Sequence, residues 1–363
     1  MPPKKTHVGL IYGGLSSEHE VSVASARNVF AALDSAGYRV TPIRIDREGR
    51  WHAEDPMRSA LRGPEADPDA SSAQILFAPA EAARLFVERG AGEPREPLAL
   101  DVAFVMLHGQ NGEDGRVQGL LHTVGIPYTG ADVLASASCM DKEVTKRQLR
   151  DAGLPIVPFR VIRYGQHLAF EEATAALGLP LFVKPANSGS SVGTSKVEDE
   201  AQFTDAVTEA FNYDNKVLVE TAVTGREIEC AVLGNEEPRA STPGEVVSTA
   251  AFYTYDAKYE DADAAHMEVP ADIPDAVAAR IRSLATDAYR VLGCEGMARV
   301  DFFVTPEHEV FVNEINTIPG FTERSMYPVM WEHEGLSAEQ LADTLIQLAF
   351  DRHARDARLK TTR

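Results

Sequence analysis

Short apolar segments alternate with helical patterns from the start of the chain, and this alternation constrains the fold more than any other feature. Residues 7–12 read as a buried strand that ends at a Gly-Gly pair. Val21, Val29 and Leu33 then fall near one face of a helix, and residues 40–45 form a second strand. Because two strands joined through a helix make a βαβ unit, the sequence predicts an α/β fold with a parallel sheet covered by helices.

The pattern continues along the chain with one interruption. We expect strands at 102–107, 181–184 and 217–220, and helices at 114–124, 141–151, 199–212, 274–292 and 338–350. Residues 53–97 contain many prolines and predict long loops around one helix near residues 80–89. We expect the first domain boundary near residue 132.

Length, charge and cysteine content limit the class of protein. A chain of 363 residues holds about two or three domains. Its net charge of −20 repels phosphate backbones, so neither nucleic acid nor an anionic membrane is expected as a partner. Cys139, Cys230 and Cys294 form no CxxC pair, which disfavours a disulfide framework or a structural zinc site. The chain has no membrane-spanning apolar run and no cleavable leader, so we expect a cytoplasmic protein.

A predicted β-hairpin near the C-terminal end carries the strongest chemical signal. Two strands flank a loop at residues 305–308, and we expect Val304 to pair with Glu309. That register places Arg299 opposite Glu314, with both side chains on one face. A shift of the register by one residue would turn them to opposite faces.

In that register, one face of the hairpin gathers polar side chains. They are Arg299, Asp301, Glu314 and Asn316. Two carboxylates and an amide are hard oxygen ligands that suit magnesium, which keeps water and substrate phosphates in its shell. Val310 and Val312 precede them on the same face and favour a core that opens into a site. An exposed strand face with a cross-strand ion pair is the alternative.

A glycine–serine loop at residues 184–193 has the composition of an anion-binding loop. Gly189 and Gly193 allow backbone N–H groups to approach a phosphate, and Lys184 adds a positive charge at the end of the preceding strand. The loop lacks the GK[ST] ending of a P-loop. A flexible surface turn is the alternative on composition alone.

The same loop contains a G-x-S-x-G pattern centred on Ser191, which is also the signature of a serine hydrolase. His108 and Gly109 could then form an oxyanion-hole motif. Two observations disfavour a hydrolase, because residues 185–188 separate the serine from its strand and residues 194–197 read as extended. No G-x-G-x-x-G motif follows the first strand, which disfavours a nicotinamide enzyme.

Two further segments are candidate ligand sites. Residues 13–22 join a strand to a helix, where Glu18 either favours the helix dipole or holds a ligand ammonium. Residues 108–115 follow a buried strand, and their glycines with Glu113 indicate a loop shaped for a ligand.

Seven motifs, taken together and in order, resemble those of D-alanine–D-alanine ligases of the ATP-grasp superfamily. They are GGLSSEHEVS at 13–22, LHGQNGEDG at 107–115, MDK at 140–142, VKPANSGSSVG at 183–193, YDAKY at 255–259, GMARVD at 296–301 and NEINTIPGFT at 313–322. The resemblance is weakest across 47–100. It implies an ATP-grasp fold of the α/β (α+β) class, in which an N-terminal parallel α/β domain precedes two α+β subdomains that sandwich ATP. The implied bounds are 1–132, 133–223 and 224–363.

The resemblance implies roles on the nucleotide side. The residues matched to ATP binding are Lys142, Lys184, Ser191, Glu220, Val223 and Glu227. The two lysines correspond to phosphate contacts. Glu220 and the backbone near Val223 correspond to the adenine site, and Glu227 to the ribose site. Asp301, Glu314 and Asn316 match the ligands of two Mg²⁺ or Mn²⁺ ions, the site that the hairpin pattern also predicts.

The resemblance implies further roles on the amino-acid side. The matched residues are Glu18, His108, Ser190, Lys258, Tyr259, Arg299, Gly320, Ser325 and Met326. Glu18 would anchor the ammonium of the first D-alanine, assisted by Ser190 and by Tyr259 on a mobile loop over 250–265. Lys258, on that loop, would hold phosphate or substrate carboxylate. His108 is counted among the substrate-binding residues.

The remaining matches concern the second substrate and the oxyanion. Ser325 and Met326 would receive the carboxylate of the second D-alanine, and Arg299 with the Gly320 N–H would bind the oxyanion. Glu323 and Arg324 depart from the smaller or neutral groups expected beside this pocket.

The implied reaction joins two D-alanine molecules for peptidoglycan precursor synthesis in the cell wall. ATP converts one carboxylate to an acyl phosphate, which the amine of the second D-alanine attacks. A D-alanine–D-lactate ligase is an alternative that Lys258 and Tyr259 disfavour, and the metal ligands disfavour a non-catalytic nucleotide-binding regulator. The family habit implies a homodimer, and activation by a monovalent cation is a further option.

Overall fold

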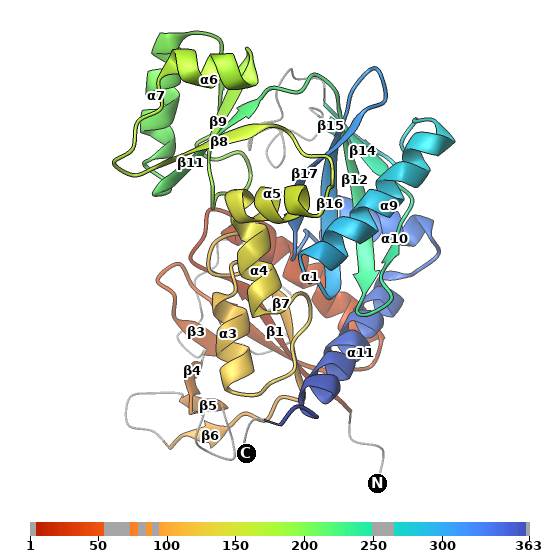
Figure 1. The fold of residues 1–363 in the computed structure, drawn as a ribbon. Coiled ribbons are helices and arrows are strands. Elements are labelled where there is room, and N and C mark those ends of the chain that lie inside the picture. The colour runs from red at the N-terminus through yellow and green to blue at the C-terminus, as the bar shows by residue number, and fades with distance from the viewer. Residues whose placement is uncertain (1–4, 54–72, 79–84, 89–93, 249–264, 361–363) are drawn as a thin grey trace.

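The computed structural model describes residues 5–53, 73–78, 85–88, 94–248 and 265–360, which form three sheets with helices packed against them (Figure 1). The expectations for Lys258 and Tyr259 lie outside the described residues.

The first sheet has the parallel centre that the opening βαβ pattern predicted. β1 (His7–Gly13) pairs in parallel with β2 (Arg39–Ile45) and with β7 (Val102–Met106), and α1 (His19–Ser35) connects β1 to β2. β1 and β7 are buried along their whole length, as is typical of strands covered on both faces.

Antiparallel strands extend this sheet beyond β2. They are β3 (Trp51–Ala53), β4 (Ala73–Phe77), β5 (Leu85–Glu88) and β6 (Glu96–Pro97), and the strand order is β6-β5-β4-β3-β2-β1-β7. The helix predicted near residues 80–89 is therefore wrong for its described part. Leu85 and Val87 are buried in alternation with their neighbours, so pairing with the edge of a sheet overrides a weak helical composition.

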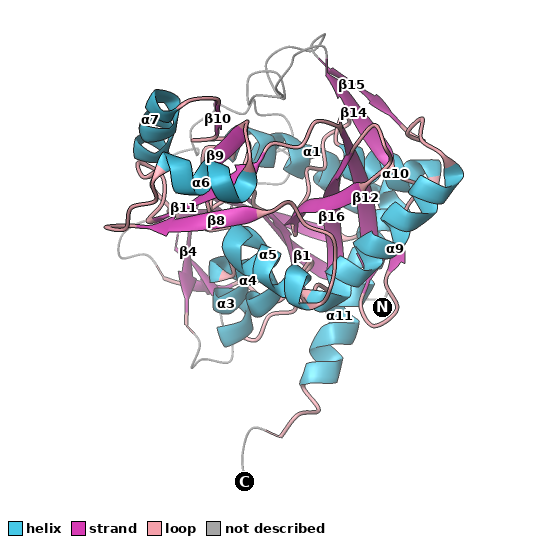
Figure 2. Cartoon of the chain, turned by 45° about the horizontal axis from the view of Figure 1, so that its top comes forward, coloured by secondary structure: helices cyan, strands magenta, loops and turns pink. Residues whose placement is uncertain are grey.

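The second sheet has a hydrophobic core of its own. Its strands, in the order β10-β9-β11-β8, are β8 (Phe159–Arg163), β9 (Leu181–Pro185), β10 (Ser195–Val197) and β11 (Lys216–Thr221). All neighbouring pairs are antiparallel. α6 (Phe170–Leu177) and α7 (Glu200–Ala210) lie together on one side of it (Figure 2). Leu181, Val183 and Phe203 are among the residues of this core.

Three helices connect the first sheet to the second. They are α3 (Arg116–Thr123), α4 (Val133–Met140) and α5 (Lys142–Asp151). Asp141 begins α5 as its N-cap, because its side chain accepts a hydrogen bond from the Val144 backbone N–H at 3.1 Å.

The third sheet carries the predicted hairpin. Its strands are β12 (Arg226–Gly234), β13 (Arg239–Ala240), β14 (Gly244–Ser248), β15 (Ala265–Glu268), β16 (Gly296–Val304) and β17 (Val310–Asn316). The main strand order is β15-β14-β12-β16-β17. α9 (Asp275–Val291) packs on this sheet, and α10 (Met326–His333) and α11 (Ala338–Asp356) follow the hairpin. None of the described helices combines the length and apolarity needed to cross a membrane.

The hairpin forms in a register different from the predicted one. Val304 pairs with Val310 and not with Glu309, so the ladder begins one residue away from the expected alignment. Continued unchanged, this register would turn Glu314 away from the face that carries Arg299.

A β-bulge restores the convergence of the polar side chains. The ladder skips Asn313, which is an extra residue on β17. Asp301 therefore lies directly opposite Glu314, and Arg299 lies opposite Asn316. The predicted shared face is confirmed, although a bulge and not a regular ladder produces it.

The bulge also corrects the expectation for the apolar residues of β17. Val310, Val312 and Ile315 are buried in one core cluster, whereas Glu314 and Asn316 are only half-buried. The two valines thus lie on the face opposite to Glu314, because the extra residue exchanges the two faces of the strand.

A buried cation joins the C-terminal helix to the connection after the first sheet. Arg352 on α11 is 5% exposed, donates hydrogen bonds to the carbonyls of Tyr128 and Gly130, and lies 4.4 Å from the centre of the Tyr128 ring. α11 also packs against α1, so the end of the chain is part of the core around the first sheet. Two buried carbonyls depend on this one guanidinium.

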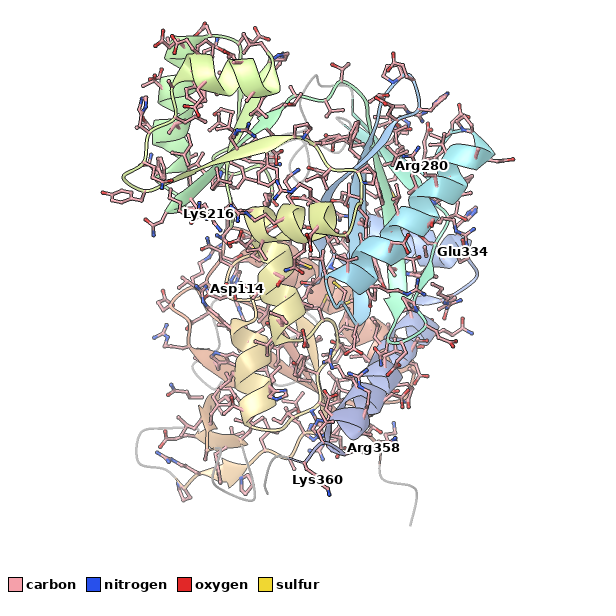
Figure 3. The ribbon with its side chains drawn as sticks, in the orientation of Figure 1. Asp114, Lys216, Arg280, Glu334, Arg358 and Lys360 are labelled. Atoms are coloured by element: carbon pink, nitrogen blue, oxygen red, sulfur yellow. The ribbon has the colours of Figure 1, made fainter. Side chains whose placement is uncertain are left out.

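We predict that Arg352→Met lowers the free energy of unfolding by about 3 kcal/mol, because two buried carbonyls lose a charged donor. Denaturant titration followed by the fluorescence of Trp331, which lies in the same core, measures the change. Arg358→Met is the control, since Arg358 is exposed beyond the end of α11 (Figure 3), and it should change stability by less than about 0.5 kcal/mol. Equal stability of the two variants would contradict this role for Arg352.

Candidate functional site

Several distant segments meet around a cleft of about 750 Å³, part of which is open to solvent. The start of α1, the segment after β7, the junction of α4 and α5, the glycine–serine loop and the end of the hairpin all contribute to it. The predicted site residues that line it are Glu18, His108, Lys142, Ser190, Arg299, Glu314, Asn316 and Gly320.

Arg299 and Asp301 form a bidentate ion pair on β16. The Nε–Oδ1 and Nη2–Oδ2 distances are both 2.7 Å, and the Arg299 Nε lies 3.0 Å from a carboxylate oxygen of Glu229 on β12. Burial lowers the pKa of the Arg299 guanidinium, but Asp301 and Glu229 outweigh it and hold this pKa well above its ordinary value. Arg299 is therefore a permanently charged group fixed in one orientation at the cleft.

Glu314 and Asn316 complete the polar face of the hairpin. The Asn316 Nδ2 donates to the Asp301 Oδ2 at 2.9 Å, and the Glu314 Oε2 lies 3.2 Å from the Lys142 Nζ. Lys142 also donates to the Ser188 carbonyl at 2.6 Å, so it lies between the hairpin and the glycine–serine loop.

The oxygen atoms on this face fit a magnesium site by their chemistry. The described residues contain no group of three His, Cys, Asp or Glu side chains arranged for a metal. The predicted set has only two carboxylates, Asp301 and Glu314, and the third oxygen is the amide of Asn316. Such a sparse oxygen set suits Mg²⁺, which keeps several waters and substrate phosphates as ligands.

Glu18 lies at the start of α1 without capping it. Its side chain makes no cap hydrogen bond, and its Oε1 instead accepts a hydrogen bond from the Ser190 Oγ at 2.5 Å. Gly109 has a φ of +72°, which favours glycine, and a Cβ there would lie 2.5 Å from the Glu18 Oε2, so a larger residue would displace this carboxylate. Of the two sequence interpretations of Glu18, this geometry favours the ligand anchor over the helix dipole.

Ser190 and Ser191 both have positive φ, at 50° and 59°. Non-glycine residues adopt this conformation rarely, and such strain is concentrated at ligand sites. A serine hydrolase would have a strand directly before this serine and a helix directly after it. In this structure β9 ends at Pro185, before Ser191, and the strand β10 begins at Ser195. This local structure agrees with the two observations that disfavoured a hydrolase.

His108 and Glu113 hold the segment after β17 in place. The His108 Nδ1 lies 2.8 Å from the Ile318 carbonyl, and Glu113 accepts backbone hydrogen bonds from Gly109 at 2.8 Å and Ile318 at 2.9 Å. Burial and the neighbouring Glu18 carboxylate raise the pKa of Glu113 to about 8. Below that pH the proton on Glu113 relieves the repulsion between the two acidic side chains.

Glu220 is enclosed by two lysines. Its Oε2 lies 2.7 Å from the Lys184 Nζ, and its Oε1 lies 3.0 Å from the Nζ of Lys146 on α5. Burial raises the pKa of Glu220, but the two lysines outweigh it and lower this pKa below its ordinary value. Val223 is half-buried in the segment between β11 and β12, and Glu227 is exposed at the start of β12.

The remaining predicted site residues lie in the segment after the hairpin. Gly320 lines the cleft, and Ser325 is the N-cap residue of α10 with its Oγ 2.8 Å from the Thr322 Oγ1. The Met326 side chain is buried in the core, so only its backbone N–H at the start of α10 could meet a ligand. Glu323 and Arg324 are exposed.

Two residues of this site, Lys146 and Glu229, were not predicted from the sequence, and Glu113 was predicted only as part of a ligand-binding loop. Lys146 follows Lys142 by one helical turn, a spacing that could have identified it. Glu229 reaches Arg299 only because β12 pairs with β16, and no local pattern indicates that pairing. Glu113 stands in the recognised loop, but its contact with Ile318 joins residues 205 positions apart.

Comparisons with known proteins give the family. A model described as D-ala D-ala ligase N-terminus matches residues 7–131, and one described as D-ala D-ala ligase C-terminus matches residues 148–347. The chain is 50% identical to D-alanine–D-alanine ligase A of Escherichia coli strain K12, over 99% of this chain and 100% of that protein. It is 46% identical to the D-alanine–D-alanine ligase of Shouchella clausii, over 99% of this chain and 98% of that protein.

Solved structures agree with these matches. The D-alanine–D-alanine ligase from Coxiella burnetii superimposes with a TM-score of 0.86 at 40% identity, over 97% of each chain. The VanG D-Ala:D-Ser ligase from Enterococcus faecalis superimposes with a TM-score of 0.84 at 33% identity, over 95% of this chain and all of the other. These relatives share the ATP-grasp fold that the sequence motifs implied. The chain therefore belongs to the D-alanine–D-alanine ligase family.

Proposed function

We propose that this protein joins two D-alanine molecules to D-alanyl-D-alanine at the expense of ATP, giving ADP and phosphate, for peptidoglycan precursor synthesis. One observation carries the proposal. The Arg299–Asp301 pair with Glu314 and Asn316 faces the same cleft as the Glu18–Ser190 pair, so a phosphate-handling group and an ammonium-binding group can act on one substrate.

The nucleotide would lie between the second and third sheets. Lys142 and Lys184 would contact its phosphates, Glu220 and the backbone near Val223 its adenine, and Glu227 its ribose. Ser191 would contribute to the loop over the phosphates. Asp301, Glu314 and Asn316 would hold two Mg²⁺ or Mn²⁺ ions, which neutralise phosphate charge when bound.

The amino acids would occupy the side of the cleft nearest the first sheet. Glu18 would bind the ammonium of the first D-alanine, with Ser190 and His108 beside it. Ser325 and the Met326 N–H at the start of α10 would receive the carboxylate of the second D-alanine, because backbone N–H groups at a helix start bind anions. Lys258 and Tyr259 would complete the site from the expected loop over 250–265, which would exclude water.

The proposed chemistry follows from these positions. A carboxylate is a poor electrophile, and transfer of the γ-phosphoryl group of ATP to it creates an acyl phosphate with a good leaving group. The amine of the second D-alanine then attacks the carbonyl carbon. Arg299 and the Gly320 N–H would stabilise the oxyanion of the tetrahedral intermediate, which collapses to the dipeptide as phosphate leaves.

The identity of the second substrate is the point on which relatives differ. One superimposed structure is that of a D-Ala:D-Ser ligase, so D-serine is a second candidate for that position, together with the D-lactate alternative. Dipeptide formation from D-alanine alone remains the proposal, because the Lys258-Tyr259 pair is present in the sequence.

Several wider properties are part of the same proposal. The three units would be residues 1–132, 133–223 and 224–363, with ATP between the last two. The protein would act in the cytoplasm as a homodimer, and a monovalent cation is a candidate activator. The three separate sheets support this division.

Substrate dependence tests the proposed function directly. ADP release is measured with ATP and Mg²⁺ in the presence of D-alanine, L-alanine, D-serine or D-lactate, and products are identified by mass spectrometry. We expect D-alanine alone to support release, with one dipeptide formed per ADP. If ADP release required D-serine or D-lactate, that compound and not D-alanine would be the second substrate. No release under any condition would refute the proposal.

Arg299→Ala tests the oxyanion role. We expect ligation to fall about 100-fold or more, because loss of one oxyanion donor has an effect of this size, while the Kd for ATP changes little. Arg226→Ala is the matched control, since Arg226 pairs with Glu245 on the same sheet and does not line the cleft. Ligation by Arg299→Ala at the rate of the control would exclude Arg299 from this role.

A further inference from the structure

Three charged side chains form a buried cluster where α5 meets the second sheet. We call Lys146, Glu220 and Lys184 the lysine–glutamate triad. Each oxygen of the Glu220 carboxylate lies near one lysine Nζ, at 3.0 Å for Lys146 and 2.7 Å for Lys184. With both lysines protonated, two cations share one anion and the triad carries a net charge of +1. Burial lowers the pKa of Lys146, and the adjacent Glu220 counteracts that shift.

The two lysines differ in their freedom to leave Glu220. The Lys146 side chain is 0% exposed, whereas that of Lys184 is 12% exposed. Lys146 extends from α5 and has its Nζ 5.9 Å from the centre of the Phe159 ring. Lys184 is the penultimate residue of β9, next to the glycine–serine loop. Of the two lysines, only Lys184 is accessible to solvent and therefore to a ligand.

The helix that carries Lys146 is itself tied to the second sheet. Lys216 on β11, labelled in Figure 3, forms ion pairs with Asp141 at 2.5 Å and with Glu143 at 2.9 Å. The Nη2 of Arg163 on β8 donates to both carboxylate oxygens of Glu143, at 2.8 and 3.0 Å. These contacts keep α5 against β8 and β11, so Lys146 remains beside Glu220.

The need to neutralise the buried Glu220 carboxylate implies different roles for the two lysines. The Glu220 side chain is only 4% exposed, and a buried carboxylate that loses its counter-ion is strongly destabilised. If Lys184 were its sole partner, moving Lys184 to a phosphate would leave Glu220 unpaired. With Lys146 in place, Glu220 stays neutralised, and the surplus charge of the triad is available to an anionic ligand.

We propose that Lys146 is a positioning residue that remains the counter-ion of Glu220 and thereby frees Lys184 to bind the phosphates of the nucleotide. This inference rests on the proposed function, because the ligand of Lys184 is the nucleotide assumed there. Lys146 itself touches neither nucleotide nor amino acid.

Binding of ADP and of adenosine to Lys146→Met tests the proposal. In this variant Glu220 retains Lys184, so the phosphates lose their lysine. We expect the Kd for ADP with Mg²⁺ to rise at least tenfold in calorimetry, and the Kd for adenosine to change less than threefold. A general disturbance of the site would weaken both ligands equally, and that result would overturn the proposal, as would unchanged ADP binding.

A second substitution separates charge balance from packing. Glu220→Gln removes the anion that Lys146 neutralises, so Lys146→Met/Glu220→Gln and Glu220→Gln should bind ADP within about threefold of each other. A greater loss in the double variant would show that Lys146 acts other than through Glu220 and would overturn the proposal. This comparison also decides the question if Lys146→Met alone does not fold.

Arg150→Met is the matched control on the same helix. The Arg150 guanidinium also lies over the Phe159 ring, at 5.8 Å, but forms no ion pair with Glu220 among the described contacts. We expect it to bind ADP as the wild type does, and an equal loss in this control would overturn the proposal. Failure of the wild type to bind ADP or to ligate D-alanine would refute the proposed function itself, whereas a normal wild type with a normal Lys146→Met refutes only this inference.

Discussion

The extra residue on β17 is the constraint on which the candidate site depends. If β17 alternated strictly in the register seen next to the hairpin loop, Glu314 would be buried and Ile315 would point toward the cleft. The bulge at Asn313 exchanges these faces, so Ile315 joins the core while Glu314 lies opposite Asp301. Lys142 then acquires its Glu314 partner, and Asp301 its Asn316 partner, from this one irregularity.

Basic side chains gather at the cleft although the molecule as a whole is acidic, and acidic side chains accompany them there. The chain carries a net charge of −20, yet Lys142, Lys184 and Arg299 gather around the cleft and its margin. Each of these cations is held by a carboxylate, which fixes its position in the absence of a ligand. An anionic substrate can compete for such partly buried groups, because they are only weakly solvated and exchange one anion for another. The net charge of the chain therefore reflects its outer surface, whereas a ligand at the site meets the local ion pairs.

Long-range contacts assemble the remaining part of the cleft. The Glu18–Ser190 hydrogen bond joins residues 172 positions apart, and the contact of His108 with Ile318 spans 210 positions. The packing of three sheets against one another brings these segments to one place. A ligand that binds there contacts residues from several distant segments of the chain at once.

The amino-acid sequence by itself determined the elements and the chemistry of the site. The βαβ start, the helix from residue 142 and the polar residues of the hairpin were predictable, because periodicity and residue type are local properties. The strand at Leu85–Glu88 was not predictable, since pairing with a sheet edge overrode its helical composition. Tertiary structure alone decided the bulge at Asn313, the pairing of Glu229 with Arg299 and the burial of Lys146 beside Glu220. Each of these depends on which distant strand or helix lies alongside, and a single sequence contains no local signal for that choice.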